Sequence, residues 1–311
     1  MTESRTTGTT ACYIVGDWGT TNLRLFLLDS ASKQCLDRRN GPGIANTNPD
    51  QIPKILAKLI KPWIGQNIEQ ILLCGMVGST IGWLDAGYIN CPLPLATLKD
   101  HLFRVPTHGI PTQIVPGIRC TSPTGTIDVM RGEETQLLGA LQCQAHLNSG
   151  SHLLCLPGTH SKWVQISSGV VESFLTSLSG ELYATLKRHS ILVPNTENNL
   201  PDEAVFIQGI QRSIEQSSCD LLHLLFETRS RQITGEISAE QAADFLSGLI
   251  IGKDIQNAIK LFGSTHSQSQ IHFIANKSLN HLYSLACEHC KIPCQTLDGD
   301  QLSLAGMQTL R

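Results

Sequence analysis

The stretch GDWGTTN at residues 16–22 decides the expected fold, because apolar runs lie on both sides of it, at 12–15 and 23–28. Gly, Asp, Thr and Asn favour turns, and short apolar runs beside a turn are typical of buried strands. We therefore predict a β-hairpin over this part of the chain. Its tip carries Gly, Thr and Asn, which can bind a polar ligand.

A second stretch of the chain has the same design. The apolar run at 153–156 is followed by the turn PGTHS at 157–161, and a return strand begins at Lys162. Gly19-Thr20 and Gly158-Thr159 therefore occupy equivalent positions in two hairpins, although the two halves share little sequence identity. The repeated design predicts two lobes of similar architecture.

Length and composition agree with two lobes of an ordinary globular protein, since the chain has 311 residues, 41% hydrophobic and 16% charged. A net charge of −3 gives no basic field for nucleic acid or an anionic membrane. The first residues lack an apolar signal segment, and no apolar run reaches the roughly 18–20 residues of a membrane span. We therefore expect a cytoplasmic protein with neither nucleic acid nor membrane as a partner.

Helical and strand patterns alternate through the rest of the chain, which predicts an α/β fold. The tail at 1–11 is small and polar, and we expect it to be disordered. Ser238 and Gln241 fit a capping box that opens a long apolar helix. The other expected elements are helices at 53–60, 133–146, 278–287 and 300–310, and strands at 71–74, 271–275 and 291–297.

The first hairpin tip is a candidate phosphate site. A tight turn with Gly presents backbone N–H groups to phosphate oxygens, and the Thr hydroxyls add donors. The expected phosphate contacts are Gly19, Thr20, Thr21 and Asn22. Asp17, at the end of a buried strand, is placed to hold Mg²⁺, which prefers one or two carboxylates with waters. The alternative is an ordinary hairpin with polar turn residues.

The second hairpin tip offers the same kinds of donor. They are Gly158, Thr159, His160 and Ser161. Lys162 either neutralises charge on a transferring group or is a surface lysine beside an edge strand. Leu156 stands at the position that corresponds to Asp17, so the second tip supplies no carboxylate.

The segment DVMRGEETQ at 128–136 places acids where a helix begins. Glu133 and Glu134 can simply stabilise the positive end of the helix dipole. Alternatively, one of them is a general base that orients a substrate hydroxyl for phosphoryl transfer, with Asp128 as a third candidate.

The segment CGMVGS at 74–79 and the aromatic residues that follow are typical of a pocket wall for a small polar ligand. The candidate contacts are Gly78, Ser79, Trp83 and Tyr88. Arg24 and Arg131 can each bind a carboxylate through two bonds, or they can be structural salt-bridge partners. The chain contains neither GxxxxGK nor GxGxxG, which disfavours P-loop and Rossmann folds.

The chain has eleven cysteines, which we expect to be reduced and mostly buried. Cys287, Cys290 and Cys294 lie close together in the sequence, and we expect them to pack in the core. A metal site there would need a fourth ligand, such as His289 or His281.

Taken in order, the motifs GDWGTTNLR, CGMVGS, DVMRGEETQLLGA, LPGTHSKWV and SGELYATLKRHSIL resemble the 2-dehydro-3-deoxygalactonokinase family. This family belongs to the sugar kinase, actin and heat-shock ATPase superfamily, and the resemblance runs from Tyr13 to the C-terminus. It implies two ribonuclease-H-like lobes flanking a nucleotide cleft, which we expect at 12–130 and 131–311. It also implies ATP and Mg²⁺ as cofactors and phosphorylation of the C6 hydroxyl of 2-dehydro-3-deoxy-D-galactonate in galactonate breakdown.

The resemblance also implies roles for individual residues. Gly132-Glu133 matches the position of the base in related sugar kinases, with Glu134 and Asp128 as rivals. The expected catalytic residues are Glu133, Asp17, Arg131 and Lys162, and Arg24 is grouped with the sugar-acid contacts at Gly78, Ser79, Trp83 and Tyr88. Asn276 is expected at the nucleotide, where Ala275-Asn276 replaces the paired glycines that are usual in the superfamily and narrows the approach.

Two alternatives to this function stay open. One is a kinase of another small sugar or sugar acid, since one fold accepts many substrates. The other is a catalytically silent sugar or nucleotide sensor on the same scaffold. The sequence leaves the oligomeric state open, with a homodimer as one candidate.

Overall fold

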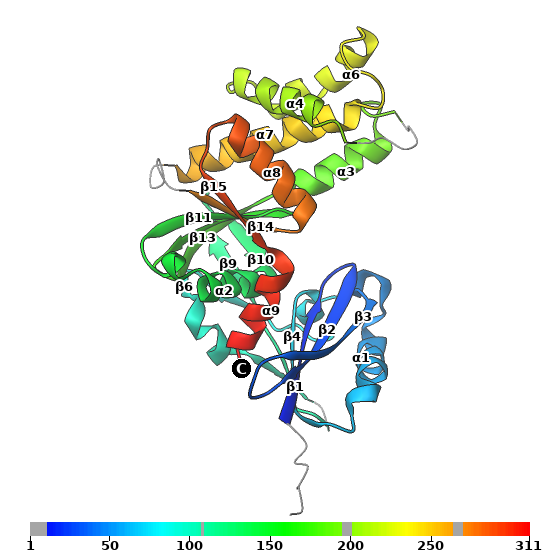
Figure 1. The fold of residues 1–311 in the computed structure, drawn as a ribbon, viewed down its shortest axis with the longest axis vertical. Helices are drawn as coiled ribbons and strands as arrows, with labels where there is room; N and C mark the ends of the chain where they lie inside the picture. Colours follow the sequence, from blue (N-terminus) through cyan, green and yellow to red (C-terminus); the bar gives the residue numbers. More distant parts are fainter. Residues whose placement is uncertain (1–10, 107–108, 195–200, 264–269) are drawn as a thin grey trace, which may run out of the picture. The chain divides into compact units, whose positions relative to one another are not determined.

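The computed structural model describes residues 11–106, 109–194, 201–263 and 270–311, and Figure 1 shows their helices and strands. The chain divides into two compact units. Unit 1 comprises residues up to 120 together with 129–146 and 300–311, and unit 2 comprises 121–128 and 147–299. The expected tail at 1–11 lies outside the described residues except for Ala11, which begins the first strand.

The main sheet of unit 1 begins with the predicted hairpin. Its strands, in spatial order, are β3 (Cys35–Pro42), β2 (Asn22–Asp29), β1 (Ala11–Trp18), β4 (Asn67–Cys74), β8 (Thr112–Ile114) and β7 (Phe103–Val105). The first three strands are antiparallel neighbours, while β4 runs parallel to β1 and β8 runs parallel to β4. The two apolar runs beside GDWGTTN therefore pair with each other, as predicted.

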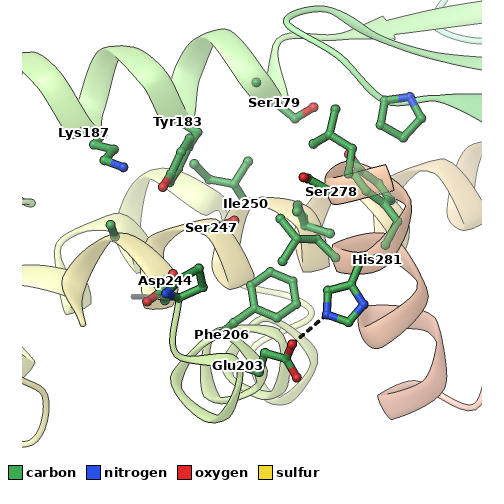
Figure 2. A pocket seen from close by; sticks show the side chains of 18 of the residues that line it. Ser179, Tyr183, Lys187, Glu203, Phe206, Asp244, Ser247, Ile250, Ser278 and His281 are labelled. Carbon is green, nitrogen blue, oxygen red and sulfur yellow. Dashed lines mark hydrogen bonds and ion pairs between the residues drawn. The ribbon is translucent and has the colours of Figure 1, made fainter. Parts of the chain in front are cut away.

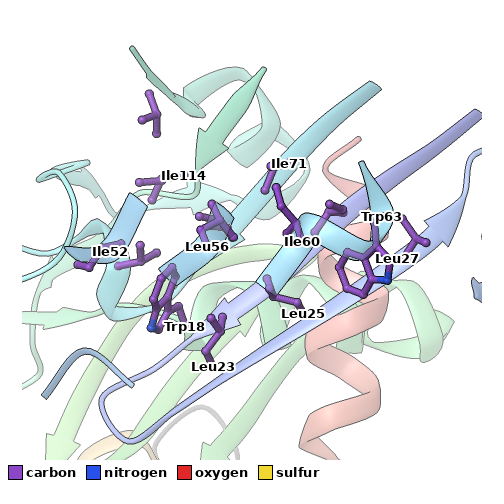
Figure 3. Packing of buried hydrophobic residues seen from close by; sticks show 14 of the residues in the cluster. Trp18, Leu23, Leu25, Leu27, Ile52, Leu56, Ile60, Trp63, Ile71 and Ile114 are labelled. Atoms are coloured by element: carbon purple, nitrogen blue, oxygen red, sulfur yellow. The ribbon is translucent and has the colours of Figure 1, made fainter. Parts of the chain in front are cut away.

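The core of unit 1 lies between this sheet and helix α1 (Ile52–Ile60). Ile52, Leu56 and Ile60 recur every four residues, so one face of the helix is apolar and buried. Figure 3 shows them beside Trp18 and Trp63, whose side chains have at most 2% of their surface exposed. Truncating a buried Trp to Ala usually costs about 3–5 kcal/mol, so these two rings are major contributors to the stability of the unit.

The sheet of unit 2 repeats the strand order of unit 1. In spatial order its strands are β15 (Cys294–Asp298), β14 (Ile271–Ala275), β11 (Ser151–Leu156), β12 (Ser161–Ser167) and β13 (Val170–Ser177). As in unit 1, the first three strands in the sequence, β11, β12 and β13, are antiparallel neighbours. On the other side of β11, β14 runs parallel to β11 and β15 runs parallel to β14. This order is ribonuclease-H-like in both units, and the predicted α/β fold class is confirmed.

The helices of unit 2 include a tightly crossed pair. They are α3 (Ser179–His189), α4 (Glu203–Glu215), α5 (Leu221–Leu225), α6 (Glu227–Ile233), α7 (Ala242–Phe262) and α8 (Lys277–His289). A Cβ on Gly209 would lie 2.3 Å from the Phe245 carbonyl oxygen, so only glycine allows α4 and α7 to cross this closely. The two reciprocal bonds of the predicted capping box form, since the backbone N–H of Ser238 donates to Gln241 at 2.9 Å and that of Gln241 donates to Ser238 at 3.3 Å. The predicted position is wrong, however, because they lie in the turn before α7, whose N-cap is Gln241 rather than Ser238.

Two helices belong to a different unit from the one that we expected. Helices α2 (Glu133–Cys143) and α9 (Gly299–Thr309) fall almost wholly in unit 1, so the expected boundary between lobes at residues 130 and 131 is wrong for both. The reason is their close crossing. A Cβ on Gly139 would lie 1.9 Å from the Leu302 carbonyl oxygen, and one on Gly306 would lie 1.8 Å from that of Thr135. The end of the chain thus returns to unit 1.

The remaining strands are short. They are β5 (Tyr88–Asn90), which is parallel to β9 (Gly117–Thr121), together with β6 (Leu93–Pro94) and β10 (Ile127–Met130). Element bounds differ from the predictions mainly at their ends, since β15 begins at Cys294 rather than at residue 291 and α2 ends at Cys143. No helix in the described ranges is both long and apolar enough to cross a membrane.

The three clustered cysteines lie at the apolar core of unit 2, as expected. Cys287 is fully buried, and Cys290 and Cys294 pack against the same core. The Cys287 and Cys294 thiols are hydrogen-bonded, which lowers the pKa of Cys294 to about 7 and raises that of Cys287. In the described part of the chain, no three His, Cys, Asp or Glu side chains come together as a metal site.

Candidate active site

The tip of the first hairpin is fixed by its backbone. The N–H of Gly19 donates to the carbonyl of Asn22 at 3.0 Å. Gly43 passes so close that a Cβ on it would lie 2.2 Å from the carbonyl carbon of Thr21. Thr20 and Thr21 are nevertheless exposed. The predicted phosphate-binding tip is therefore both rigid and accessible.

Asp17 lies near the end of β1, opposite Arg24 on β2. The pKa of Asp17 is raised to about 6, mainly by burial. The positive charge of Arg24, whose Nη1 is 4.0 Å from the Asp17 carboxylate, acts to lower this pKa. The negative charges of Asp300 and Glu133 act to raise it. All four groups belong to unit 1. Asp17 is thus an acidic group with one cation, Arg24, and two further carboxylates, Asp300 and Glu133, near it.

Two glycines bring the end of β1 towards the start of α2. Gly75, after β4, has a φ of 90°, and a Cβ there would lie 2.8 Å from the Trp18 carbonyl oxygen and 3.4 Å from the Asp17 carboxylate. Gly132 has a φ of 106°, and its Cβ would lie 3.4 Å from the Cα of Gly75. Both positions are in the left-handed region that favours glycine. This close approach explains why the charge of Glu133 affects Asp17.

The three candidate bases have different environments. Glu133 is half-buried, and its Oε2 accepts a hydrogen bond from the backbone N–H of Arg131 at 3.0 Å. Glu134 is completely buried, and burial followed by the charge of Glu133 raises its pKa to about 8. Asp128, in unit 2, accepts bonds from the Thr176 hydroxyl and N–H at 2.7 and 2.5 Å. Glu134 is protonated at neutral pH and Asp128 anchors a strand, so Glu133 is favoured as a base.

The two candidate carboxylate-binding arginines are also distinguished. Arg24 already forms an ion pair with Asp300, and its side chain is 41% exposed. Arg131 is only 3% exposed and lies over the ring of Tyr88, with 4.4 Å from its Cζ to the ring centroid. Its Nη2 donates to the Gly87 carbonyl at 3.0 Å, while its Nε and Nη1 have no hydrogen-bond partner among the residues that the structure describes.

The other predicted sugar contacts are divided between surface and core. Gly78 and Ser79 are buried at the short turn after β4, and a Cβ on Gly78 would lie 3.0 Å from Nη1 of Arg131. The Ser79 hydroxyl donates to the Met76 carbonyl at 2.7 Å. Trp83 is partly buried and packs against the core of unit 1. Gly78 and Tyr88 therefore lie beside Arg131, whereas Ser79 and Trp83 have structural contacts of their own.

Unit 1 also contains a cavity of about 370 Å³ beside the first hairpin. Its polar lining residues are Asp17, Arg24, Arg38, Asn40, Asp300, Gln301 and Ser303. The charges at Arg24 and Asp17 thus face an open space rather than a packed core.

The second hairpin tip is joined to the start of α3. The Glu181 N–H donates to the Thr159 carbonyl at 2.9 Å, and the Ser161 and Ser179 hydroxyls are 2.7 Å apart. A Cβ on Gly180 would lie 2.2 Å from the Gly158 carbonyl oxygen. These contacts hold the tip and the first turn of the helix together.

Lys162 lies inside the sheet rather than at its surface. Strand β12 is paired with both β11 and β13, and Lys162 is only 5% exposed. Its Nζ lies 3.4 Å from the carbonyl oxygen of His160. The alternative of a surface lysine on an edge strand is therefore wrong.

A cavity of about 460 Å³ lies in unit 2 and reaches the second hairpin tip at Gly158. Figure 2 shows that side chains from α3, α4, α7 and α8 point into it. Its lining includes Ser179, Tyr183, Phe206, Asp244, Ser247, Ile250 and Ser278. The expected nucleotide contact Asn276 instead caps α8, because its Oδ1 accepts a hydrogen bond from the Leu279 N–H at 3.0 Å.

Most of this lining carries no sequence signal. Tyr183, Phe206 and Ser247 come from three different helices, and of these three only Tyr183 lies in one of the motifs that resemble the kinase family, SGELYATLKRHSIL. Gly158 is itself an expected phosphate contact, and Ser278 lies two residues after the expected nucleotide contact Asn276.

Comparisons with known proteins agree on one family. The family model described as 2-keto-3-deoxy-galactonokinase matches residues 17–310. A Rhizobium meliloti (strain 1021) protein named probable 2-dehydro-3-deoxygalactonokinase is 34% identical over 302 residues, which cover 96% of each chain. The 2-dehydro-3-deoxygalactonokinase of Escherichia coli (strain K12) is 33% identical over 305 residues, or 97% of this chain and 98% of the other.

A solved structure agrees as well. The crystal structure of a Sinorhizobium meliloti protein described as the same kinase superposes with a TM-score of 0.87 at 34% identity. The superposition covers 96% of this chain and 97% of that one. The similarity therefore extends over both units.

Proposed function

Since this chain belongs to the 2-keto-3-deoxy-galactonokinase family, we propose that it is an ATP-dependent kinase of 2-dehydro-3-deoxy-D-galactonate. It transfers the γ-phosphoryl group to the C6 hydroxyl of this sugar acid, in galactonate breakdown. The observation that carries the proposal is the approach of Asp17 and Glu133, two carboxylates brought together by Gly75 and Gly132.

Glu133 is the proposed base. Phosphoryl transfer needs a group that orients the attacking hydroxyl and accepts its proton, and a carboxylate at a helix start can do both. The Arg131 N–H fixes one oxygen of Glu133 at 3.0 Å, which limits the positions that the carboxylate can adopt.

Asp17 is the proposed ligand of Mg²⁺. The ion is usually held by one or two carboxylates plus phosphates and waters, so a cluster of several protein ligands is not required. The neighbouring negative charges of Asp300 and Glu133, which help to raise the pKa of Asp17, also favour a bound cation. When bound, Mg²⁺ would offset negative charge on the phosphates.

The cavity in unit 2 is the proposed nucleoside site. Its volume of about 460 Å³ lies within the range of about 300–1,000 Å³ typical of small-molecule sites. Tyr183 supplies aromatic surface for a base, the buried Phe206 forms part of the wall behind it, and Ser247 and Asp244 supply polar groups. Gly158 lines the same cavity, which favours phosphate binding at the second hairpin tip.

Arg131, rather than Arg24, is the proposed partner of the substrate carboxylate. A buried guanidinium with unpaired donors is costly, and a carboxylate ligand removes that cost. Asp85, whose Oδ1 is 3.7 Å from Nη2, is half-exposed and is the group that a substrate carboxylate would displace. Arg24 has Asp300 as a partner already.

The test is a kinase assay on the purified full chain with ATP, Mg²⁺ and 2-dehydro-3-deoxy-D-galactonate, followed by mass spectrometry of the product. We expect one ADP for each phosphorylated sugar acid. A panel of other sugar acids and neutral sugars tests the alternative of a different substrate. Nucleotide or sugar binding without any phosphorylated product would overturn the proposal and favour a sensor.

A further inference from the structure

We propose that His160 and Glu181 form a dyad in which Glu181 holds the His160 imidazole as a cation against the phosphates of the bound nucleotide. His160 contacts phosphate, and Glu181 is a positioning residue that acts through it. The inference rests on the proposed kinase function and adds a group that stabilises charge on the transferring phosphoryl.

The two side chains meet at the second hairpin tip. Nε2 of His160, on the turn between β11 and β12, is hydrogen-bonded to Oε2 of Glu181 in the first turn of α3. The side chains are 47% and 54% exposed, so the pair is accessible to a ligand. Gly158, Ser179 and Gly180, which flank the pair in the sequence, line the cavity proposed for the nucleoside.

The backbone at Glu181 is anchored to the second hairpin tip. Its own N–H donates to the Thr159 carbonyl at 2.9 Å, beside the contact of Gly180 with Gly158. The buried bond between the Ser161 and Ser179 hydroxyls joins the same two segments from the other side. Because these contacts join the loop to the helix turn, they keep the Glu181 carboxylate within reach of the His160 ring.

The chemistry of the pair determines the charge of the ring. An ionised carboxylate only accepts hydrogen bonds, so Nε2 carries a proton and Nδ1 is the nitrogen left for the ligand. Phosphate oxygens are acceptors as well, so Nδ1 binds them only as an N–H donor, which makes the ring an imidazolium.

Lys162 cannot take this place without rearrangement. It is the other cation of the loop, but it is 5% exposed, and its Nζ points to the carbonyl oxygen of His160 at 3.4 Å. His160 is therefore the basic side chain of the tip that is exposed and open to phosphate.

The protonation state of His160 can be measured without turnover. In protein labelled with ¹⁵N-histidine and bound to a non-hydrolysable ATP analogue with Mg²⁺, the His160 signals are assigned from their loss in His160→Gln. In the unsubstituted protein we expect the ¹⁵N chemical shifts of a His160 ring that is protonated on both nitrogens. In Glu181→Gln we expect the ¹⁵N chemical shifts of a neutral His160 ring. A neutral His160 in the unsubstituted complex would overturn the inference, whether or not the protein is a kinase.

A double-mutant cycle tests the coupling during turnover. We expect His160→Gln to lower kcat by about 10²-fold, as for the loss of one charge-stabilising donor, and Glu181→Gln by about tenfold. In the His160→Gln background, Glu181→Gln should cost nothing further, because it acts through the ring. Equal losses in both backgrounds would contradict the dyad.

Two controls keep this cycle decisive. Glu172→Gln removes a carboxylate from strand β13 of the same unit and should leave kcat unchanged. All variants should retain the thermal unfolding midpoint of the unsubstituted protein, since the exposed pair contributes little to stability. If the unsubstituted protein fails to phosphorylate any sugar acid, the kinase proposal falls, while the NMR measurement still decides the dyad.

Discussion

The backbone N–H of Arg131 donates to the carboxylate of Glu133 at 3.0 Å, so the residue that we propose for substrate binding also positions the proposed base. The next residue, Glu134, turns into the core and bonds the Gly132 N–H at 2.6 Å. Two adjacent glutamates at the start of one helix thus have different environments. Glu133 lies near the charge of Asp17, whereas Glu134 is buried and has no contact with solvent.

This contrast predicts opposite results for two matched substitutions. Glu133→Gln should lower kcat by about 10²–10⁴-fold, because it removes a general base. Glu134→Gln should change kcat only slightly, since Gln keeps an acceptor for the Gly132 N–H. Steady-state kinetics with saturating ATP would measure both. Comparable losses in the two variants would place the base elsewhere.

Stability should depend on pH through Glu134. Its pKa of about 8 in the folded protein is above the ordinary value of 4.5, so the folded state keeps a proton that the unfolded chain loses. The stabilisation is complete below about pH 4.5 and is lost as the pH rises through about 8. Chemical denaturation between pH 6 and 8 should show a fall in the free energy of unfolding, and Glu134→Gln should flatten it. If the free energy of unfolding of Glu134→Gln depended on pH as steeply as that of the unsubstituted protein, Glu134 would not be the group that holds the buried proton.

Asp17 should make metal binding depend on pH. Because its pKa is about 6, protons compete with a cation more strongly below that pH. Titration with Mg²⁺ and a non-hydrolysable ATP analogue should show weaker binding at pH 5 than at pH 7.5. Asp17→Asn should remove most of this difference and most of the turnover. An equal pH effect in the variant would assign the metal to other groups.

Arg131 should determine the preference for a carboxylate. Arg131→Met keeps the apolar bulk against Tyr88 but removes the positive charge. We expect KM for the sugar acid to rise by about tenfold or more, because this is the effect of losing one charged hydrogen-bonding partner. KM for the methyl ester of the same sugar acid should change little. The matched control is Arg24→Met, which should leave the ratio of acid to ester unchanged. A constant ratio in Arg131→Met would refute the assignment.

The crossing of α2 and α9 should be sensitive to a single methyl group. Gly139→Ala places its Cβ 1.9 Å from the Leu302 carbonyl oxygen, and overpacking of this kind usually costs about 1–3 kcal/mol. Gly65→Ala is the control, since a Cβ there meets nothing within 4 Å. Urea denaturation of both variants should separate them clearly. Equal stabilities would mean that the helices can move apart at little cost.

Local sequence determined much of the fold. The two turns with apolar flanks were sufficient for both hairpins, because turn chemistry and strand burial act over a few residues. The capping box at Ser238 and Gln241 was likewise readable, since its two bonds join residues three apart. The return of α9 to unit 1 could not be predicted from local sequence. It depends on the contact of two helices at Gly139 and Gly306, which are 167 positions apart in the 311-residue chain.

The sequence by itself determined two hairpins with Gly-Thr tips, the acids near Glu133 and a specific set of ordered motifs that resembles one kinase family. Only the tertiary structure showed which member of each pair is buried and which is accessible: Glu134 rather than Glu133, Arg131 rather than Arg24, and Lys162 rather than His160. The physical reason is burial: the charge and donors of a side chain depend on which distant segments exclude water from it, and no local pattern records that.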